Sequence, residues 1–108
     1  MEASITEYRI VLVTVGSSQQ GENIARTLLT QKLAACVNMS PVDSWYWWEG
    51  KINSDREYQL IIKTNLDKLS ALTDKIKTLH NYEVPEIVAI PISDGSKSYL
   101  DWLGDNLK

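Results

Sequence analysis

The residues whose side chains could bind a metal ion lie in a polar connector around residue 83 and in an earlier segment around residue 57. The connector contains His80, the only histidine of the chain, together with Glu83 and Glu86. Glu57 adds a further carboxylate from the earlier segment. Imidazole and carboxylate groups that converge on one point can bind copper, zinc or another divalent cation. One histidine cannot form a histidine cluster within a single subunit, and His80 can instead end a helix, where its partial positive charge suits the helix dipole.

A catalytic role would need an activated nucleophile or an acid–base pair. Cys36, the only cysteine, lies in the apolar segment 33–37, away from the histidine or positive charge that activates a thiol. A buried structural cysteine is therefore predicted. Glu57, Lys63 and Tyr82 can form a polar cleft with the two connector glutamates, and paired carboxylates can transfer protons. No nucleophile, phosphate-binding loop or metal triad accompanies them, so we expect no enzymatic activity.

Length and composition predict one soluble domain. The chain has 108 residues, 44% hydrophobic and 23% charged, so we expect a single domain over residues 8–108 behind a flexible tail of residues 1–7. A net charge of −3 and a pI of about 5.0 argue against binding to nucleic acid. No apolar run approaches the roughly 20 residues of a membrane helix, and the first residues lack a secretory signal. With a single cysteine, these features predict a cytoplasmic protein that has no membrane partner.

A long β-hairpin over residues 34–64 must position several of these side chains. Its turn is predicted at Glu49-Gly50, because a glycine flanked by aromatic and β-branched runs marks a tight turn. Pro41 cannot donate a ladder hydrogen bond, so it predicts a bulge or bend in the first arm. Pairing the arms residue by residue about the turn gives one predicted core face, made of Val37, Met39, Trp45, Trp47, Ile52, Tyr58, Leu60 and Ile62.

The elements outside the hairpin complete a recognisable order. They are a strand over 8–15, a helix over 19–32, a helix that follows the cap Asn65 and runs to 79, a strand over 87–92 and a short helix after 96. The order βαββαβ with an extra C-terminal helix predicts a ferredoxin-like sandwich of the α+β class. In that arrangement both main helices cover one face of an antiparallel sheet.

Two features predict that another copy of the chain covers part of this subunit. The first, third and last strands are apolar on both faces, although two helices can cover only one face. The hairpin arms are about twice the usual length of roughly five or six residues, so the tip overhangs the domain. Tyr46, Trp47 and Trp48 near the tip are predicted interface residues, with a ligand-stacking platform as the alternative for Tyr46 and Trp48. An ion pair between Lys63 and Glu86 is predicted at the same interface.

Five segments, in order, match one protein family. They are Lys32–Asn38, Tyr46–Ile52, Glu57–Thr64, His80–Glu86 and Tyr99–Leu103. Together they resemble the CutA divalent-cation tolerance proteins over residues 8–107. The resemblance implies a ferredoxin-like subunit in an interlocked homotrimer, with the hairpins packed between subunits and a shape similar to the PII nitrogen-signalling proteins. It also implies copper binding and a role in tolerance to copper and other divalent metals.

In such a trimer, His80 can combine with the three glutamates named above, from one or two subunits, to bind copper or another divalent cation. Some bacterial members carry a cysteine in the first strand and a second histidine before the shared one. This chain has Val13 and Leu79 there, so weak binding is predicted. Most members read His-Pro-Tyr where this chain has His80-Asn81-Tyr82, which predicts a less rigid connector.

Three classes of function follow from the sequence. The resemblance favours a trimeric metal-tolerance protein that binds divalent cations. The alternatives are a PII-like regulator that binds a small ligand in clefts between subunits, and a structural trimer that serves as a scaffold. The chain has no glycine-rich phosphate-binding loop, so a regulatory ligand would not be a nucleotide.

Overall fold

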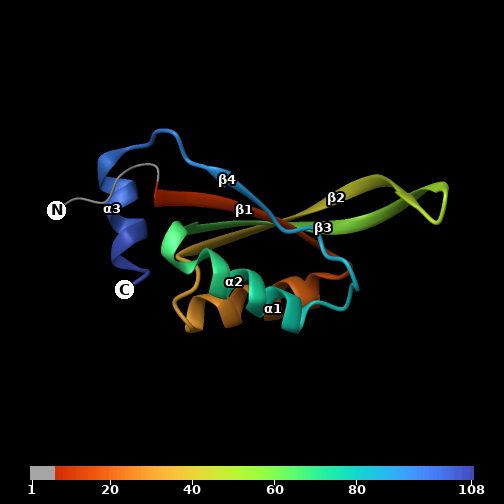
Figure 1. The fold of residues 1–108 in the computed structure, drawn as a ribbon, viewed down its shortest axis with the longest axis horizontal. Helices are drawn as coiled ribbons and strands as arrows, with labels where there is room; N and C mark the ends of the chain where they lie inside the picture. Colours follow the sequence, from red (N-terminus) through yellow and green to blue (C-terminus); the bar gives the residue numbers. More distant parts are fainter. Residues whose placement is uncertain (1–6) are drawn as a thin grey trace.

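The computed structural model describes residues 7–108, so the tail predicted over residues 1–7 lies outside the described residues except for Glu7. The elements in chain order are β1 (Tyr8–Val15), α1 (Ser18–Thr30), β2 (Cys36–Trp48), β3 (Lys51–Asn65), α2 (Leu66–Leu79), β4 (Val88–Pro91) and α3 (Lys97–Asp105). The strands form one antiparallel sheet in the order β2-β3-β1-β4, with α1 and α2 on one face (Figure 1). This is the predicted ferredoxin-like α+β arrangement with one extra helix.

The hydrophobic core lies between the sheet and the two main helices. β1 runs through the middle of the sheet, and its residues Val11, Val13 and Val15 are fully buried in one cluster with Ile24 and Leu28 of α1. The alternate residues of β1 point to the opposite face, because side chains along a strand alternate between faces. Helices α1 and α2 therefore cover one face of the sheet, as predicted.

The hairpin turns where the sequence predicts. Glu49 and Gly50 both have positive φ angles, of 51° and 74°, the pattern of a type I′ turn that matches the twist of the flanking strands. From this turn the pairing of β2 with β3 continues without interruption, and Pro41 pairs directly with Tyr58. The predicted bulge at Pro41 is therefore wrong. β2 is an edge strand, so a residue without an N–H group is accommodated in a regular register.

The distal half of the hairpin extends beyond the rest of the sheet. β1 ends at Val15, opposite Tyr58, and the parts of β2 and β3 beyond this point pair only with each other (Figure 1). The predicted core face is consequently a core face only at its base, where Leu60 is fully buried. Towards the tip, Trp45 and Trp47 are 69% and 72% exposed. The overhang gives the subunit a length of 50 Å against a width of 26 Å.

Side-chain caps explain where the helices begin. Ser17 and Asn65 each accept a hydrogen bond from the backbone amide three residues later, at 3.2 and 3.1 Å, and these residues precede α1 and α2. α1 ends at Thr30, two residues before the predicted end, because Lys32 has a positive φ of 59° that a right-handed helix does not accommodate. β4 is also shorter than predicted and lies at a sheet edge, as its proline indicated.

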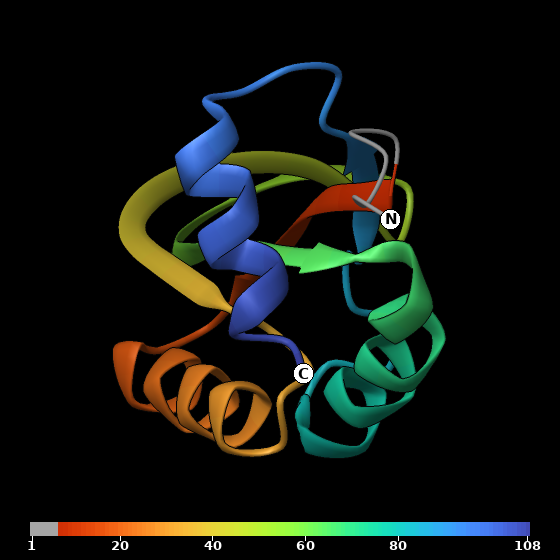
Figure 2. The ribbon, with the colours of Figure 1, turned by 90° about the vertical axis from the view of Figure 1, so that its left-hand side faces the viewer.

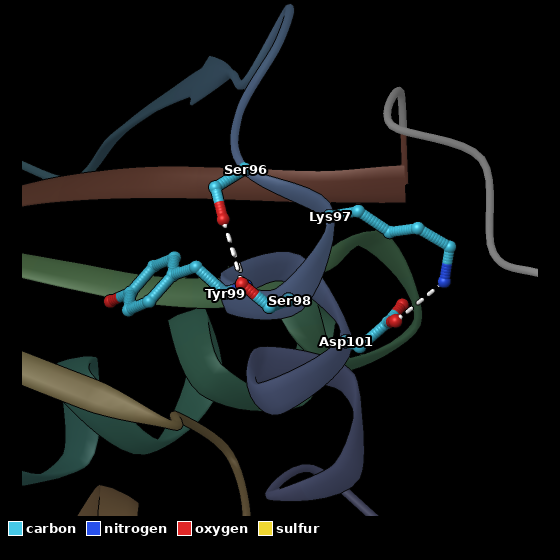
Figure 3. A network of polar contacts seen from close by, with 5 residues as sticks. All are labelled: Ser96, Lys97, Ser98, Tyr99 and Asp101. Atoms are coloured by element: carbon cyan, nitrogen blue, oxygen red, sulfur yellow. Dashed lines mark hydrogen bonds and ion pairs between the residues drawn. The ribbon is translucent and has the colours of Figure 1, made fainter.

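The C-terminal helix α3 lies across one end of the sheet (Figure 2). Ser96 caps it, with its hydroxyl 3.0 Å from that of Ser98, and Lys97 forms an ion pair with Asp101 at 2.7 Å (Figure 3). The helix buries the start of β1 in a second, smaller hydrophobic cluster. It therefore shields one end of the face that α1 and α2 leave uncovered.

The remainder of that face is apolar and open in the single chain. The pairing of β1 with β4 places Ile10 beside Ile90 and Leu12 beside Val88. Val88 and Ile90 are 49% and 43% exposed. The prediction that the two main helices leave an apolar face uncovered is thus confirmed.

Candidate functional site

A groove of about 790 Å³ lies where the connector after α2 meets the hairpin. It receives residues from the end of β1, from both hairpin strands and from the connector. The lining residues are Thr14, Ser44, Trp45, Tyr46, Trp47, Trp48, Glu57, Asn81, Tyr82, Glu83, Val84 and Glu86. All three glutamates that the sequence analysis singled out therefore border one groove.

Glu57 is the buried acidic group of this groove, with only 6% of its surface exposed. The hydroxyl of Tyr82 donates a hydrogen bond to Glu57 Oε2 at 2.7 Å. Burial, together with this hydrogen bond to a carboxylate, raises the pKa of Tyr82 above its ordinary value. The tyrosine ring lies over Gly16, where an added Cβ would come within 3.2 Å of the hydroxyl oxygen. A glycine at the end of β1 thus leaves space for the tyrosine that covers Glu57.

His80 is buried at the end of α2, where it joins the connector to β1. Its Nε2 lies 2.7 Å from the carbonyl oxygen of Thr14, and its Nδ1 accepts a hydrogen bond from the Tyr82 amide at 3.0 Å. A carbonyl oxygen only accepts, so Nε2 carries the proton and donates. Both ring nitrogens therefore have partners within the chain, and a metal ion could bind His80 only by displacing one of them.

The connector glutamates are placed differently from Glu57. Glu83 and Glu86 are both exposed on the border of the groove. Within residues 7–108, no three histidine, cysteine or acidic side chains come close enough together to hold a metal ion. A single chain therefore does not gather His80 and the three glutamates into one coordination site.

The predicted interface residues divide between two regions. Tyr46 and Trp48 are exposed on the face of the hairpin that borders the groove, and the Tyr46 hydroxyl donates a hydrogen bond to the Asp55 carboxylate. That hydrogen bond is the main cause of a raised pKa at Tyr46. Lys63 lies nearer α3, where its Nζ donates to the Tyr99 hydroxyl at 3.2 Å. Among the described residues, no ion pair joins Lys63 to Glu86 within one chain.

Cys36 differs from its predicted environment. It is half-buried rather than buried, because it begins the edge strand β2 instead of lying inside the sheet. Its Sγ lies 3.8 Å from Oδ1 of Asn38. Sequence reasoning also missed the contact between Tyr46 and Asp55. Pairing about the turn puts both side chains on one face at diagonal positions, a signal from which this contact could have been predicted.

The pKa of Tyr82 makes a prediction for stability at alkaline pH. A pKa raised by folding contributes stability below about pH 10, the value for an unfolded tyrosine, and this contribution is lost as the pH rises through the folded value. We therefore expect the free energy of unfolding of the wild type to fall above about pH 10. In urea unfolding curves recorded at increasing pH, the free energy of unfolding of Tyr82→Phe should fall less steeply with pH. The difference between the two slopes should correspond to at most one proton per subunit. Equal slopes would show that the Tyr82 hydroxyl does not couple to folding.

The chain is similar to proteins of one family along almost its whole length. The family described as CutA1 divalent ion tolerance protein matches residues 9–106. "Protein CutA 1, chloroplastic" of Oryza sativa is 46% identical and aligns with 92% of this chain and 56% of its own length. "Divalent-cation tolerance protein CutA" of Archaeoglobus fulgidus is 42% identical and aligns with 94% of this chain and 99% of its own. The chain thus spans little more than half of the rice relative and nearly all of the archaeal one.

Solved structures give the same comparison in three dimensions. The periplasmic divalent cation tolerance protein CutA from Archaeoglobus fulgidus superposes with a TM-score of 0.92 at 42% identity, over 94% of this chain and 99% of that one. CutA1 from Oryza sativa superposes with a TM-score of 0.92 at 45% identity, over 97% of this chain and 98% of that one. The similarity therefore includes the long hairpin and the C-terminal helix as well as the sandwich.

Proposed function

Because this chain belongs to the CutA1 divalent ion tolerance family, we propose that it acts in tolerance to divalent metal ions, copper among them, as a homotrimer that binds these ions weakly. Two relatives that are named divalent-cation tolerance proteins support the first part of the proposal. The observation that carries the second part is the groove bordered by Glu57, Glu83 and Glu86. Carboxylate oxygens bind divalent cations, and copper(II) has the highest affinity of the first-row divalent series.

The trimer is supported by the surfaces that a single chain leaves open. The hairpin carries Trp45, Trp47 and Trp48 beyond the sheet, and the sheet face around Ile90 is apolar and exposed. Large exposed apolar patches on a soluble protein mark interaction sites. We propose that hairpins from neighbouring subunits cover these patches, with Tyr46 among the contacts.

The proposed metal site lies at a subunit boundary, because residues 7–108 of one chain do not bring enough ligands together by themselves. We place Glu83 and Glu86 in it, joined by His80 or Glu57 from the same subunit or a neighbour. Lys63 is proposed to pair with Glu86 of a neighbouring subunit when no metal is bound. Val13 is fully buried in the core and does not border the groove, so a cysteine at that position would not be a ligand of this site.

Calorimetric titration of copper(II) tests this site. We expect uptake by the wild type to saturate at one ion per subunit or one per trimer. The double variant Glu83→Gln/Glu86→Gln should bind at least about tenfold more weakly, a difference of about 1.4 kcal/mol. Glu22→Gln, on the exposed surface of α1, is the matched control and should bind as the wild type does.

His80→Ala completes the copper experiment. Weaker binding would place the imidazole among the ligands. Coinciding isotherms for His80→Ala and the wild type would restrict the role of His80 to its hydrogen bonds with Thr14 and Tyr82. Unsaturable uptake that none of the variants changes would contradict the proposed site as a whole.

Two further points of the proposal concern activity and location. We propose no reaction for this protein, in keeping with a family described by ion tolerance. We propose a cytoplasmic location, supported by the single, unpaired Cys36; the words chloroplastic and periplasmic belong to the names of two relatives. No helix in the described part of the chain is long and apolar enough to cross a membrane.

A further inference from the structure

We propose that Asp94 is a site of spontaneous covalent modification, at which the aspartate isomerises to isoaspartate through a ring formed with the Gly95 amide. The product loosens the contact of the C-terminal helix α3 with the sheet. The reacting residues lie in the loop between β4 and α3, which contributes no residue to the groove of the proposed metal site. The modification is therefore independent of the proposed metal function.

The first observation is the combination of sequence and secondary structure at Asp94. It is the one aspartate that a glycine follows, and no asparagine of the chain precedes a glycine. Glycine has no Cβ, so its amide nitrogen can approach the carboxyl group of the residue before it. Each of the other aspartates lies within a strand or a helix, where backbone hydrogen bonds oppose the rotation that ring closure needs. Asp94 alone lies in a loop, where the backbone has more freedom.

The second observation is the position of the Asp94 side chain, which is folded back onto the reacting amide. The Gly95 N–H donates a hydrogen bond to Asp94 Oδ1 at 2.8 Å. This oxygen is bonded to Cγ, the atom that the nitrogen must attack, so the two reacting atoms are already held near each other. Both residues are exposed, and the segment between β4 and α3 forms an arch at the top of the view in Figure 2. Water can therefore reach the ring once it has formed.

The reaction balances without a cofactor. In the first step the Gly95 nitrogen bonds to Cγ of the protonated Asp94 carboxyl group, and the amide hydrogen leaves with the carboxyl hydroxyl group as water. The product is a cyclic succinimide. In the second step water adds to one of the two ring carbonyl carbons, and the bond from that carbon to the nitrogen breaks. Opening at Cγ restores aspartate, whereas opening at the main-chain carbonyl gives isoaspartate, in which the main chain runs through the former side chain.

The place of the loop connects this reaction to α3. Isoaspartate lengthens the main chain by one methylene group directly before Gly95, and the next residue, Ser96, caps α3. Gly95 also packs against Leu100, since an added Cβ would lie 3.3 Å from that side chain. Leu100 belongs to the cluster with Tyr8 and Leu103 that joins α3 to the start of β1. Isomerisation thus displaces both the cap and the Gly95 contact, and we expect α3 to open more often.

The test is peptide mapping of the full-length protein after weeks of incubation at neutral pH. Trypsin cleaves after Lys77 and Lys97, which gives a peptide of residues 78–97 whose only aspartate is Asp94. Isoaspartate and aspartate have the same mass. We therefore expect a second chromatographic peak of unchanged mass that grows with time and that electron-based fragmentation assigns to residue 94. Deamidation of Asn81 in the same peptide would change the mass, so it is distinguished from the isomerisation.

Two variants at the same exposed position provide matched controls. Asp94→Glu keeps the charge, but its longer side chain disfavours ring closure, so the second peak should be absent. Asp94→Asn loses ammonia instead of water and should convert at least about tenfold faster at neutral pH, a barrier lower by about 1.4 kcal/mol. The wild type should convert faster at mildly acidic pH, because the protonated carboxyl group is the form that loses water. Asp94→Asn should convert faster at alkaline pH, where the attacking amide nitrogen is more readily deprotonated.

Hydrogen exchange measures the effect on α3. The amides of Leu100 and Leu103 should exchange faster in the aged wild type, in proportion to the isomerised fraction, and at an unchanged rate in Asp94→Glu aged in parallel. Three results would overturn the proposal: no product of unchanged mass in the wild type, equal amounts of it in the wild type and Asp94→Glu, or identical exchange of α3 in fresh and aged protein. Copper(II) isotherms of fresh protein report on the metal proposal alone.

Discussion

Trp47→Ala should abolish the proposed trimer at micromolar concentration while leaving the subunit folded. Trp47 is 72% exposed on the part of the hairpin that extends beyond the sheet, so little of the subunit's own packing depends on it. Covering a tryptophan buries about 150–250 Å², worth roughly 4–6 kcal/mol as an upper bound at about 25 cal/mol per Å². A symmetric trimer loses this contribution three times.

Light scattering coupled to size exclusion measures the effect directly. The wild type should elute at about three times the subunit mass of 12.2 kDa, and Trp47→Ala mainly at the subunit mass. Leu29→Ala is a suitable control, since Leu29 is an exposed hydrophobic residue on α1, far along the chain from the hairpin tip. A variant that retained the wild-type mass at low concentration, or a monomeric wild type, would contradict the proposed assembly.

Leu60→Ala should have the largest effect on the stability of the subunit itself. Leu60 is fully buried in the middle of β3, where it pairs with Val13 on one side and Met39 on the other. Its side chain also approaches α1, since a Cβ added at Gly21 would lie 3.4 Å from it. Truncation of a buried leucine removes apolar contacts and leaves a cavity, which costs about 2–5 kcal/mol.

The neighbouring residue provides the matched control for this experiment. Ile61 lies on the opposite, open face of the sheet and is half-buried in the single chain. In denaturant unfolding, Leu60→Ala should lower the free energy of unfolding of the subunit by about 2–5 kcal/mol. Ile61→Ala should act mainly through assembly, as a change that depends on protein concentration. Equal, concentration-independent losses for both variants would show that both faces are buried within one subunit.

The features that the sequence predicts correctly are those with a local or periodic cause. Glu49-Gly50 adopts the turn that its composition indicates, and the regular alternation of the arms then determines the register. Ser17 and Asn65 begin helices because their side chains bond to amides only three residues away. None of these features depends on a residue elsewhere in the fold.

The features that the sequence does not predict depend on long-range packing. The regular strand through Pro41 follows from the edge position of β2, which becomes known only with the order of the strands. The hydrogen bond of Tyr82 to Glu57 joins residues 25 positions apart, and that of His80 to Thr14 joins residues 66 positions apart. Residue type alone therefore indicates the candidate ligands, whereas the hydrogen bonds that His80 and Glu57 already make depend on the three-dimensional structure.

The two edges of the sheet have a consequence for aggregation. An exposed edge strand offers unpaired amide and carbonyl groups to which a strand of any other chain can add. β2 and β4 are the edge strands, and each contains one proline, Pro41 in the first and Pro91 at the end of the second. A proline cannot donate to such a pairing. The proline in each edge strand therefore limits the length of a continuous ladder with a foreign strand, which disfavours fibril-like association through either edge.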